Sequence, residues 1–302
     1  MSYKVLIANR GEIALRAMRA CKELNIKTVA VYSTADRDLK HLKFADESVC
    51  IGPASPTLSY LNAAAILSAA ELTEVDGIYP GYGFLAEDPN FAEMCEKSGF
   101  KFIGPSSEII RKMGDKITAK TLAEEAGIQI VPGYKGELPD SDEKIKEIVG
   151  NIGYPIMIKA TAGGGGRGMR MVREESDLLN SLEVTIQEAL NAFGNGTVYI
   201  EKFIENPRHV EVQVVGDGKG GAIHLGTRDC SMQRKHQKII EEAPALDIDE
   251  ISLQKTLDAS ISLCKKIKYE GAGTIEFLYC LLYTSDAADE GLGVDLGGRR
   301  II

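Results

Sequence analysis

The sequence lacks any long uninterrupted apolar run, although apolar residues fill 44% of its 302 positions. A membrane-spanning helix needs about 20 consecutive apolar residues, so we expect no membrane-spanning segment and no membrane partner. The N-terminus, MSYKVLIANRGE, reaches charged residues too early for a secretory signal. These two absences favour a cytoplasmic protein.

The sequence also lacks a net positive charge and any paired spacing of cysteines. The net charge is −9, which disfavours nucleic acid as a partner. The six cysteines show no CxxC or metal-binding spacing, and the first five lie in apolar or periodic segments. We therefore expect reduced, buried thiols. The cysteines are Cys21, Cys50, Cys95, Cys230, Cys264 and Cys280.

The sequence contains no GxxxxGK[ST] motif, which disfavours a P-loop. The letters GxGxxG do occur, at Gly163, Gly165 and Gly168, but a dinucleotide-binding turn requires a helix directly after them. The residues that follow, 169–172, alternate and are β-prone. We therefore expect strand, glycine loop, strand, and the alternatives are a flap over a ligand or a flexible surface hairpin.

The chemistry of this stretch favours the flap. Bare glycine backbone can approach a polyanion closely and direct several N–H groups at it, whereas four consecutive glycines, Gly163–Gly166, are costly to order without a ligand. Lys159 ends the apolar run 155–158. A lysine on a buried strand needs an anionic partner, so the hairpin predicts a phosphate ligand.

The first hundred residues alternate strands and helices, which predicts an α/β, Rossmann-like parallel sheet. Its first turn reads ANRGEIA and not GxGxxG, so we do not expect it to bind a dinucleotide. Two short helices broken at Gly114, an exposed segment at 133–150 and a helix at 174–191 follow. The expected strands are 4–8, 27–32, 77–80, 100–104, 197–204, 208–215 and 270–279, and the other expected helices are 14–24, 59–72, 89–97 and 249–268.

Three further stretches carry candidate residues. In Arg208–Val215 the polar residues His209, Glu211 and Gln213 alternate with valines, which is typical of a solvent-facing strand, but the order of elements suggests a cleft. Residues 228–243 are rich in cations, which indicates either an anionic ligand or a solvated charge run. Glu276 lies on an apolar strand and must pair or coordinate a cation, with Mg²⁺ expected if it faces a triphosphate.

Lys159 followed by the glycine flap resembles the ATP-grasp enzymes, and the wording IKATAGGGGRGMR and RDCSMQR.HQK resembles the biotin carboxylases, with similarity from about Val5 to Tyr279. The resemblance implies a Rossmann-like N-terminal domain, 1–113, which frames the cleft and contributes to dimerisation. An ATP-grasp fold would follow, with a linker and glycine-flap subdomain at 114–202. An incomplete antiparallel-sheet subdomain would occupy 203–279.

The resemblance also implies an activity. Biotin carboxylases use ATP, Mg²⁺ (or Mn²⁺) and bicarbonate to carboxylate biotin on a carrier protein through carboxyphosphate, for example as part of acetyl-CoA carboxylase in fatty acid biosynthesis. The implied partners are the biotin carboxyl carrier protein, carboxyltransferase subunits and a second copy in a homodimer.

The family's roles map onto individual residues. Lys238 corresponds to the catalytic, bicarbonate-binding lysine, Glu276 also to a metal ligand, and Tyr82 and Gly83 to residues near the biotin ring. The residues matching ATP contacts are Lys116, Lys159, Gly164, Gly165, Gly166, Met169, Glu201, Lys202, Ile204, His209, Gln233, His236 and Glu276.

Two alternatives remain at this point. Another ATP-grasp ligase would share Lys159 and the flap but not RDCSMQR.HQK, and a nucleotide-binding or dimerisation module would bind without catalysis. Residues 280–302 depart from the family pattern and resemble a translated sequencing adapter. We therefore expect native sequence to end at Tyr279 and the chain as written to be inactive in biotin carboxylation.

Overall fold

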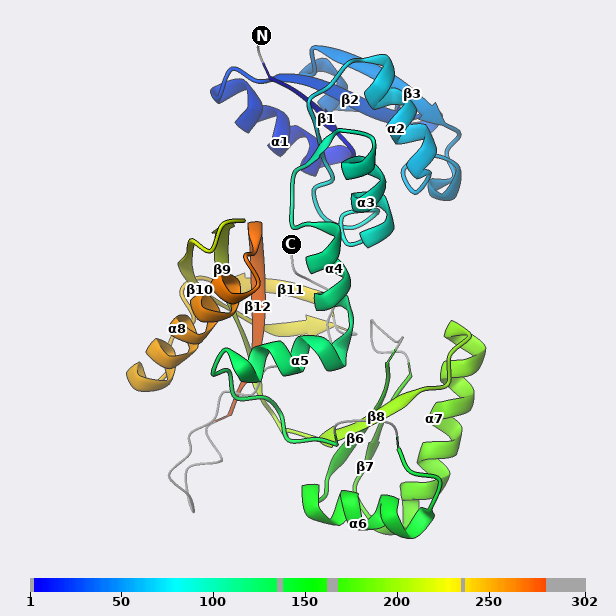
Figure 1. The fold of residues 1–302 in the computed structure, drawn as a ribbon, viewed down its shortest axis with the longest axis vertical. Helices are drawn as coiled ribbons and strands as arrows, with labels where there is room; N and C mark the ends of the chain where they lie inside the picture. Colours follow the sequence, from blue (N-terminus) through cyan, green and yellow to red (C-terminus); the bar gives the residue numbers. More distant parts are fainter. Residues whose placement is uncertain (1–2, 135–137, 162–167, 235–236, 281–302) are drawn as a thin grey trace.

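The computed structural model describes residues 3–134, 138–161, 168–234 and 237–280, without the side chains of residues 116 and 117. Strands in these residues form a five-stranded sheet β3-β2-β1-β4-β5, a three-stranded sheet β7-β6-β8 and a four-stranded sheet β11-β10-β9-β12. Figure 1 shows the three sheets one after another along the long axis of the molecule. The adapter-like interpretation of 280–302 concerns residues that, apart from Cys280, lie outside this description.

The N-terminal sheet is parallel in every pairing, as the alternation of elements predicted. Leu6 packs in one core cluster, and Val5 and Ile7 pack in another on the opposite face. Helices therefore cover both faces, which explains why these strands read as continuous apolar runs. The elements are β1 (Lys4–Ile7), α1 (Gly11–Glu23), β2 (Lys27–Ser33), β3 (Glu47–Gly52), α2 (Ala63–Leu72), β4 (Gly77–Tyr79), α3 (Pro89–Lys97) and β5 (Lys101–Phe102).

The strand order reverses at β1, which pairs with β2 on one side and β4 on the other. Open α/β sheets place ligands at such a switch point, beyond the carboxyl ends of the strands. Here the buried Asn9 donates from Nδ2 to the carbonyl oxygens of Pro80 and Tyr82, both at 2.9 Å. Asn9 thus ties the loop after β1 to the loop after β4.

A buried carboxylate, Asp36, anchors the loop after β2. Arg10 donates to both of its oxygens, at 2.6 and 2.5 Å, and Tyr60 and Ser33 donate to Oδ2 at 2.6 and 3.2 Å. The hydrogen bonds from Arg10, followed by that from Tyr60, outweigh the effect of burial and lower the pKa of Asp36 from 3.8 to about 2.

Asp36→Asn should therefore lower the free energy of unfolding at pH 7 by about 1 to 2 kcal/mol, a value discounted because Arg10 is half-exposed. A lowered pKa stabilises the fold above the unfolded-state value, and this contribution is lost as the pH falls towards about 2. The difference between parent and variant should fall to about half by pH 3. Urea unfolding followed by tyrosine near-UV circular dichroism checks this, since the chain has no tryptophan. A difference independent of pH would contradict it.

Two helices link the N-terminal sheet to the others, α4 (Ser107–Gly114) and α5 (Lys116–Glu125), with the predicted break at Gly114. Asp115 caps α5 by accepting a hydrogen bond from the Thr118 N–H at 2.8 Å. Ala123 on α5 packs in the core of the four-stranded sheet. Figure 1 shows α5 lying between that sheet and the three-stranded sheet.

The three-stranded sheet, called here the flap sheet, consists of β6 (Ile156–Ala160), β7 (Met169–Val172) and β8 (Val198–Lys202). Strands β6 and β7 pair in antiparallel fashion with Lys159 opposite Met169, which confirms the two predicted strands, while the glycines 163–166 between them lie outside the described residues. The helices α6 (Asp142–Ile152) and α7 (Leu178–Phe193) pack against it around Ile156, Ile158 and Ile200.

The four-stranded sheet consists of β9 (Arg208–Asp217), β10 (Ala222–Arg234), β11 (Gln237–Glu242) and β12 (Glu270–Tyr279), and it carries α8 (Glu250–Lys266). Strand β9 lies between β10 and β12, with Val212 and Val214 directed into the core. Glu211 lies directly opposite Glu276 on β12. The opposite face of β9 therefore carries the polar residues that the alternation predicted.

Two expectations about local structure were wrong. Strands β3, β10 and β11 were not predicted, because their polar and exposed residues hide any period of two. Cys50 was expected to be buried but is exposed on β3, and Cys21 is only partly buried, whereas Cys95, Cys230 and Cys264 are buried. All six cysteines are free thiols. None of the helices in the described part of the chain combines the length and apolar character that a membrane crossing requires.

Candidate functional site

The flap sheet and α5 bring together three charged side chains, Lys120, Lys159 and Glu201, called here the lysine–glutamate trio. Lys159 Nζ lies 2.5 Å from Glu201 Oε1, and Lys120 Nζ pairs with Glu201 Oε2. Glu201 is 3% exposed and Lys159 is 6% exposed. The anionic partner expected for Lys159 is therefore Glu201, yet one carboxylate cannot balance two ammonium groups, and the trio keeps a charge of +1.

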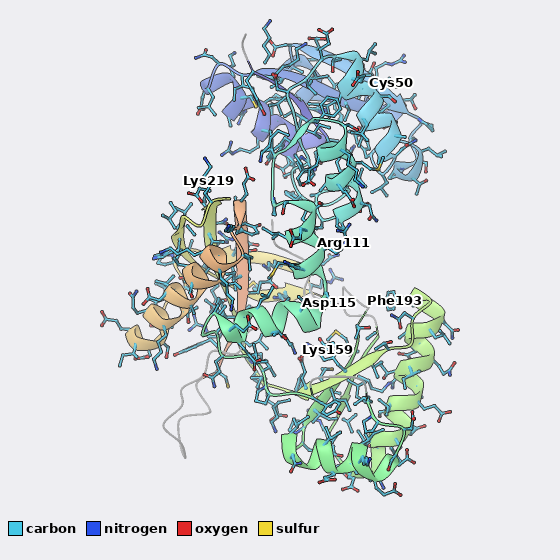
Figure 2. All side chains as sticks on the ribbon, viewed as in Figure 1. Cys50, Arg111, Asp115, Lys159, Phe193 and Lys219 are labelled. Carbon is cyan, nitrogen blue, oxygen red and sulfur yellow. The ribbon has the colours of Figure 1, made fainter. Side chains whose placement is uncertain are left out.

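Strand register explains this geometry. In the antiparallel pair β6–β8, Lys159 is opposite Tyr199 and Met157 is opposite Glu201, so Lys159 and Glu201 are diagonal neighbours on one face. That face is directed towards α5, from which Lys120 reaches across. Figure 2 shows Lys159 in the space between the flap sheet and the start of α5 at Asp115.

The four-stranded sheet carries a second cluster, to which each strand contributes one charged residue: Glu211 from β9, Arg228 from β10, Lys238 from β11 and Glu276 from β12. Arg228 Nε donates to Glu211 Oε1 at 2.5 Å, and Lys238 pairs with Glu211 Oε2. Lys238 Nζ also lies 2.6 Å from Glu276 Oε1. This four-strand cluster holds two cations and two carboxylates, so its charges balance.

Charge pairing decides the protonation of this cluster. Burial alone would raise the pKa of Glu211, but Lys238 and Arg228 outweigh it and hold the pKa below its usual range. Burial would likewise lower the pKa of Lys238, and its bonds to Glu211 and Glu276 raise the pKa instead. Both groups are therefore charged at neutral pH, and Lys238 is a cation held between two carboxylates.

Two sets of oxygen and sulfur atoms could receive a cation. Glu211, Cys230 and Glu241 have ligand atoms within 4.8 Å of one another, but Glu211 already holds two cations and burial raises the pKa of the Cys230 thiol to about 12. Glu276 fits better, because it is partly exposed and Lys238 engages only its Oε1. One carboxylate oxygen beside phosphate oxygens and water is a donor set that Mg²⁺ accepts.

Of the other predicted residues, Lys202 and Gln233 direct their side-chain nitrogens to backbone carbonyl oxygens. Lys202 Nζ donates to the carbonyl oxygens of Gly153 and Tyr154, at 3.2 and 2.8 Å, and Gln233 Nε2 donates to the carbonyl of Cys230 at 2.9 Å. The backbone N–H of His209 donates to Ser231 Oγ. Met169 is partly buried on β7. Ile204 lies in the connector, the segment 203–207 between β8 and β9.

The remaining predicted residues fall into two groups. Tyr82 and Gly83 belong to the N-terminal unit, where Tyr82 is 45% exposed and its hydroxyl donates to Glu12 at 3.0 Å. Gly83 has a φ of +69°, a conformation that favours glycine. Gly164, Gly165, Gly166, His236 and the side chain of Lys116 lie outside the described residues.

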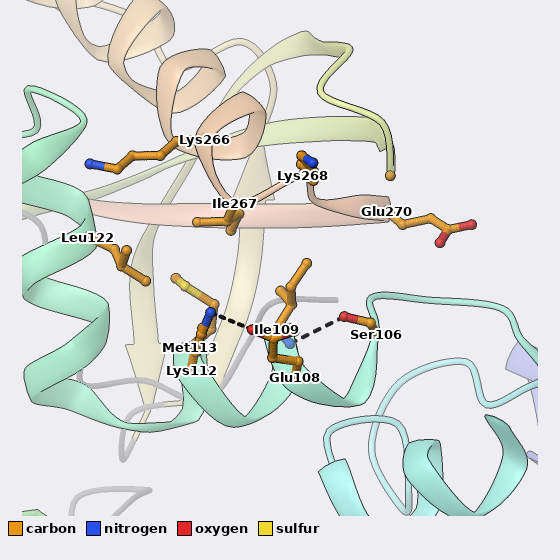
Figure 3. A pocket seen from close by; sticks show the side chains of 11 residues that line it. Ser106, Glu108, Ile109, Lys112, Met113, Leu122, Lys266, Ile267, Lys268 and Glu270 are labelled. Carbon is orange, nitrogen blue, oxygen red and sulfur yellow. Dashed lines mark hydrogen bonds and ion pairs between the residues drawn. The ribbon is translucent and has the colours of Figure 1, made fainter. Parts of the chain in front are cut away.

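A cavity of about 440 Å³ lies elsewhere, between α4 and the turn from α8 to β12, and none of the candidate residues lines it. Its floor is apolar, with Ile109 and Met113 (Figure 3). Two of its lysines are already paired, Lys112 with Glu108 and Lys266 with Glu125, each at 2.6 Å. The cavity is separate from both charged clusters.

Sequence reasoning missed Lys120. A usable signal was present, because residues four apart on a helix share a face and Lys120 follows Lys116 by four on α5. The partner could not be read from the sequence, since Glu201 lies 81 residues further along the chain.

Family models cover almost the whole described chain. Residues 1–110 match the biotin carboxylase N-terminal domain, and residues 115–283 match the ATP-binding domain of the carbamoyl-phosphate synthase L chain. Over 279 residues the chain is 61% identical to the biotin carboxylase of Pseudomonas aeruginosa and 58% identical to that of Haemophilus influenzae. Each match covers 92% of this chain and 62% of the relative, so the chain spans less than two thirds of these curated relatives.

Solved structures agree with these matches. A biotin carboxylase–β,γ-ATP complex from Campylobacter jejuni aligns with a TM-score of 0.88 and 50% identity, over 97% of this chain and 64% of that one. The biotin carboxylase domain dimer of Hydrogenobacter thermophilus 2-oxoglutarate carboxylase, in complex with MgADP, ADP and bicarbonate, aligns with a TM-score of 0.85 and 45% identity. This match covers 97% of this chain and 63% of that one. The predicted fold class, a Rossmann-like parallel sheet followed by an ATP-grasp fold, is confirmed, and the chain belongs to the biotin carboxylase family.

Proposed function

We propose that this chain carries the MgATP-binding and bicarbonate-binding part of an enzyme that carboxylates biotin on a carrier protein. The observation that carries the proposal is the four-strand cluster, in which Lys238 is held as a cation beside Glu276. The similar solved structures, which are complexes with β,γ-ATP and with MgADP, ADP and bicarbonate, support the same substrates.

The proposed roles follow from charge. Phosphoryl transfer depends mainly on positioning and on neutralising the phosphate oxygens, and the net cationic trio with Lys159 suits the phosphates. Glu276 would hold Mg²⁺, which neutralises phosphate charge when bound. Lys238 would hold bicarbonate, whose oxygen attacks the γ-phosphorus to give carboxyphosphate and ADP. The adenine would lie along the connector after β8, with Glu201, Lys202 and Ile204.

Other parts of the proposal extend to the remaining predicted residues. Lys116, Gly164, Gly165, Gly166, Met169, His209, Gln233 and His236 would contact the nucleotide. Tyr82 and Gly83 would lie near biotin. The units 1–113, 114–202 and 203–279 would act as the N-terminal, flap and metal-carrying domains. A homodimer, a biotin carboxyl carrier protein and carboxyltransferase subunits are the proposed partners, and the dimeric Hydrogenobacter structure supports the first.

Lys159→Gln should weaken MgATP binding about tenfold or more, because it removes the cation assigned to the phosphates and leaves buried Glu201 with one partner. Lys238→Gln should change MgATP affinity less than about threefold, since its assigned ligand is bicarbonate. Titration calorimetry of both variants and the parent chain measures this.

Equal losses in the two variants would show that the division of roles is wrong. A parent chain that binds no MgATP would overturn the proposed function itself. In a chain continued with the C-terminal part of a biotin carboxylase, bicarbonate- and biotin-dependent ADP release then distinguishes a biotin carboxylase from another ATP-grasp ligase, because only the former needs both.

A further inference from the structure

Lys120 holds the trio together across two structural units. Lys159 and Glu201 both belong to the flap sheet, whereas Lys120 comes from α5, whose apolar face packs in the core of the four-stranded sheet. Its ammonium pairs with Glu201 Oε2 and lies 4.8 Å from the centroid of the Tyr199 ring. A cation over an aromatic face is attracted to it, so Lys120 has two separate contacts that fix its position.

The position of Lys120 determines the charge that the trio presents. Glu201 is buried and has two oxygens, and each lysine takes one of them. With Lys120 in place the trio carries +1, and Lys159 shares its carboxylate with a second cation. Without Lys120 the same carboxylate would serve Lys159 alone, and the remaining pair would be neutral. Charge effects are strong at such a site because burial limits solvent screening.

We propose that Lys120 is a positioning residue for phosphate binding: by engaging the second oxygen of Glu201, it keeps the trio cationic and leaves Lys159 able to turn to a polyphosphate. The proposal rests on the proposed MgATP site. Lys120 acts through Glu201 and Lys159 and need not touch the nucleotide itself.

Lys120→Met keeps the length and apolar stem of the side chain and removes its charge. We expect its Kd for MgATP to rise about tenfold, while its Kd for adenosine, which has no phosphate, changes less than about twofold. Lys266→Met is the matched control, because it removes one cation from the ion pair with Glu125 in the separate cavity. Its MgATP affinity should equal that of the parent. Calorimetry gives the affinities, and thermal melting shows that each variant is folded.

The double variant Lys120→Met/Glu201→Gln separates charge from structure. It leaves Lys159 as the one charged member, so the trio again carries +1. Because Glu201 is also assigned to the adenine, the quantity compared is the ratio of the adenosine Kd to the MgATP Kd, which should recover to within about threefold of the parent's ratio. A purely structural role for Lys120 predicts the opposite, because the double variant loses both ion pairs. This variant buries no unpaired carboxylate, so it also tests the proposal if Lys120→Met does not fold.

The outcomes are distinct. Equal losses of MgATP and adenosine affinity, an unchanged Lys120→Met, or a double variant that regains none of the lost preference for MgATP over adenosine would each overturn the role of Lys120 while leaving the MgATP site intact. A parent chain that binds neither MgATP nor adenosine would overturn the proposed function and this inference together.

Discussion

Glu211→Ala is expected to lower the free energy of unfolding by about 3–5 kcal/mol, because removing one partner from a buried ion cluster leaves the others uncompensated. Glu211 is 3% exposed and, among the described residues, is the one carboxylate that contacts both cations of the four-strand cluster. Without it, Arg228 keeps a bond to Gln213 at 3.0 Å and a longer ion pair with Glu241 at 3.8 Å, and Lys238 keeps Glu276. Lys238 would then bind Glu276 more strongly, so the variant should also bind Mg²⁺ less well.

Urea unfolding of the parent and Glu211→Ala at pH 7 measures the first effect. Glu205→Ala is the matched control, because it removes a carboxylate from an exposed pair with Arg173, which should matter by less than about 1 kcal/mol. The lowered pKa of Glu211 predicts that its contribution is present above pH 4.5 and is lost as the pH falls through the lower folded-state value. Similar losses for the two variants would show that the cluster contributes no more than a surface pair.

Gly216→Ala should cost about 3 kcal/mol or more, because the side chain has no room. An added Cβ would lie 2.0 Å from the carbonyl oxygen of Tyr269, far inside van der Waals contact. The neighbouring backbone cannot retreat easily, since Gly216 pairs with Ala222 on β10 and Gly271 on β12. The clash should therefore disturb both neighbours of β9 together.

Thermal and urea unfolding of Gly216→Ala, beside Gly150→Ala, tests this steric argument. Gly150 lies in α6 with no atom within 4 Å of an added Cβ, so alanine there should stabilise the chain by about 0.5–1 kcal/mol. The two variants make the same chemical change with opposite expected signs. A Gly216→Ala protein as stable as the parent would contradict this argument, because it would mean that the backbone at Tyr269 can move away from β9 without loss of the β9–β12 pairing.

Much of the fold could be predicted from the periodicity of apolar residues and from the glycines that end helices and strands. Gly114 separates α4 from α5 as expected, and the switch from Lys159 to a glycine run and back to Met169 identified the β6–β7 hairpin. These signals are local and depend on chain geometry alone. Strand β10 was not predicted, because a register shift between His224 and Thr227 also interrupts its period of two.

The candidate site could be predicted in its residue types more than in its contacts. The alternation in β9 placed Glu211 on the polar face, but such a face is usually solvated, and only the cations from β10 and β11 explain why Glu211 is buried. The contact that Lys120 makes could not be predicted for a similar reason, although its place four residues after Lys116 was a usable signal. Its role depends on Glu201, and no local pattern records a contact between residues so far apart in sequence.

The two-sided contacts of α5 also bear on which changes in chain length the fold can tolerate. One residue added to a helix turns everything beyond it by about 100°. An insertion between Lys120 and Ala123 would therefore carry Lys120 away from Glu201 or Ala123 out of the core, whichever half of the helix moved. The tight turn at 217–221 joins β9 and β10, two neighbouring strands of one sheet, so a change in its length alters the spacing of no second structural unit. Length variation among related chains should collect in such turns and spare α5.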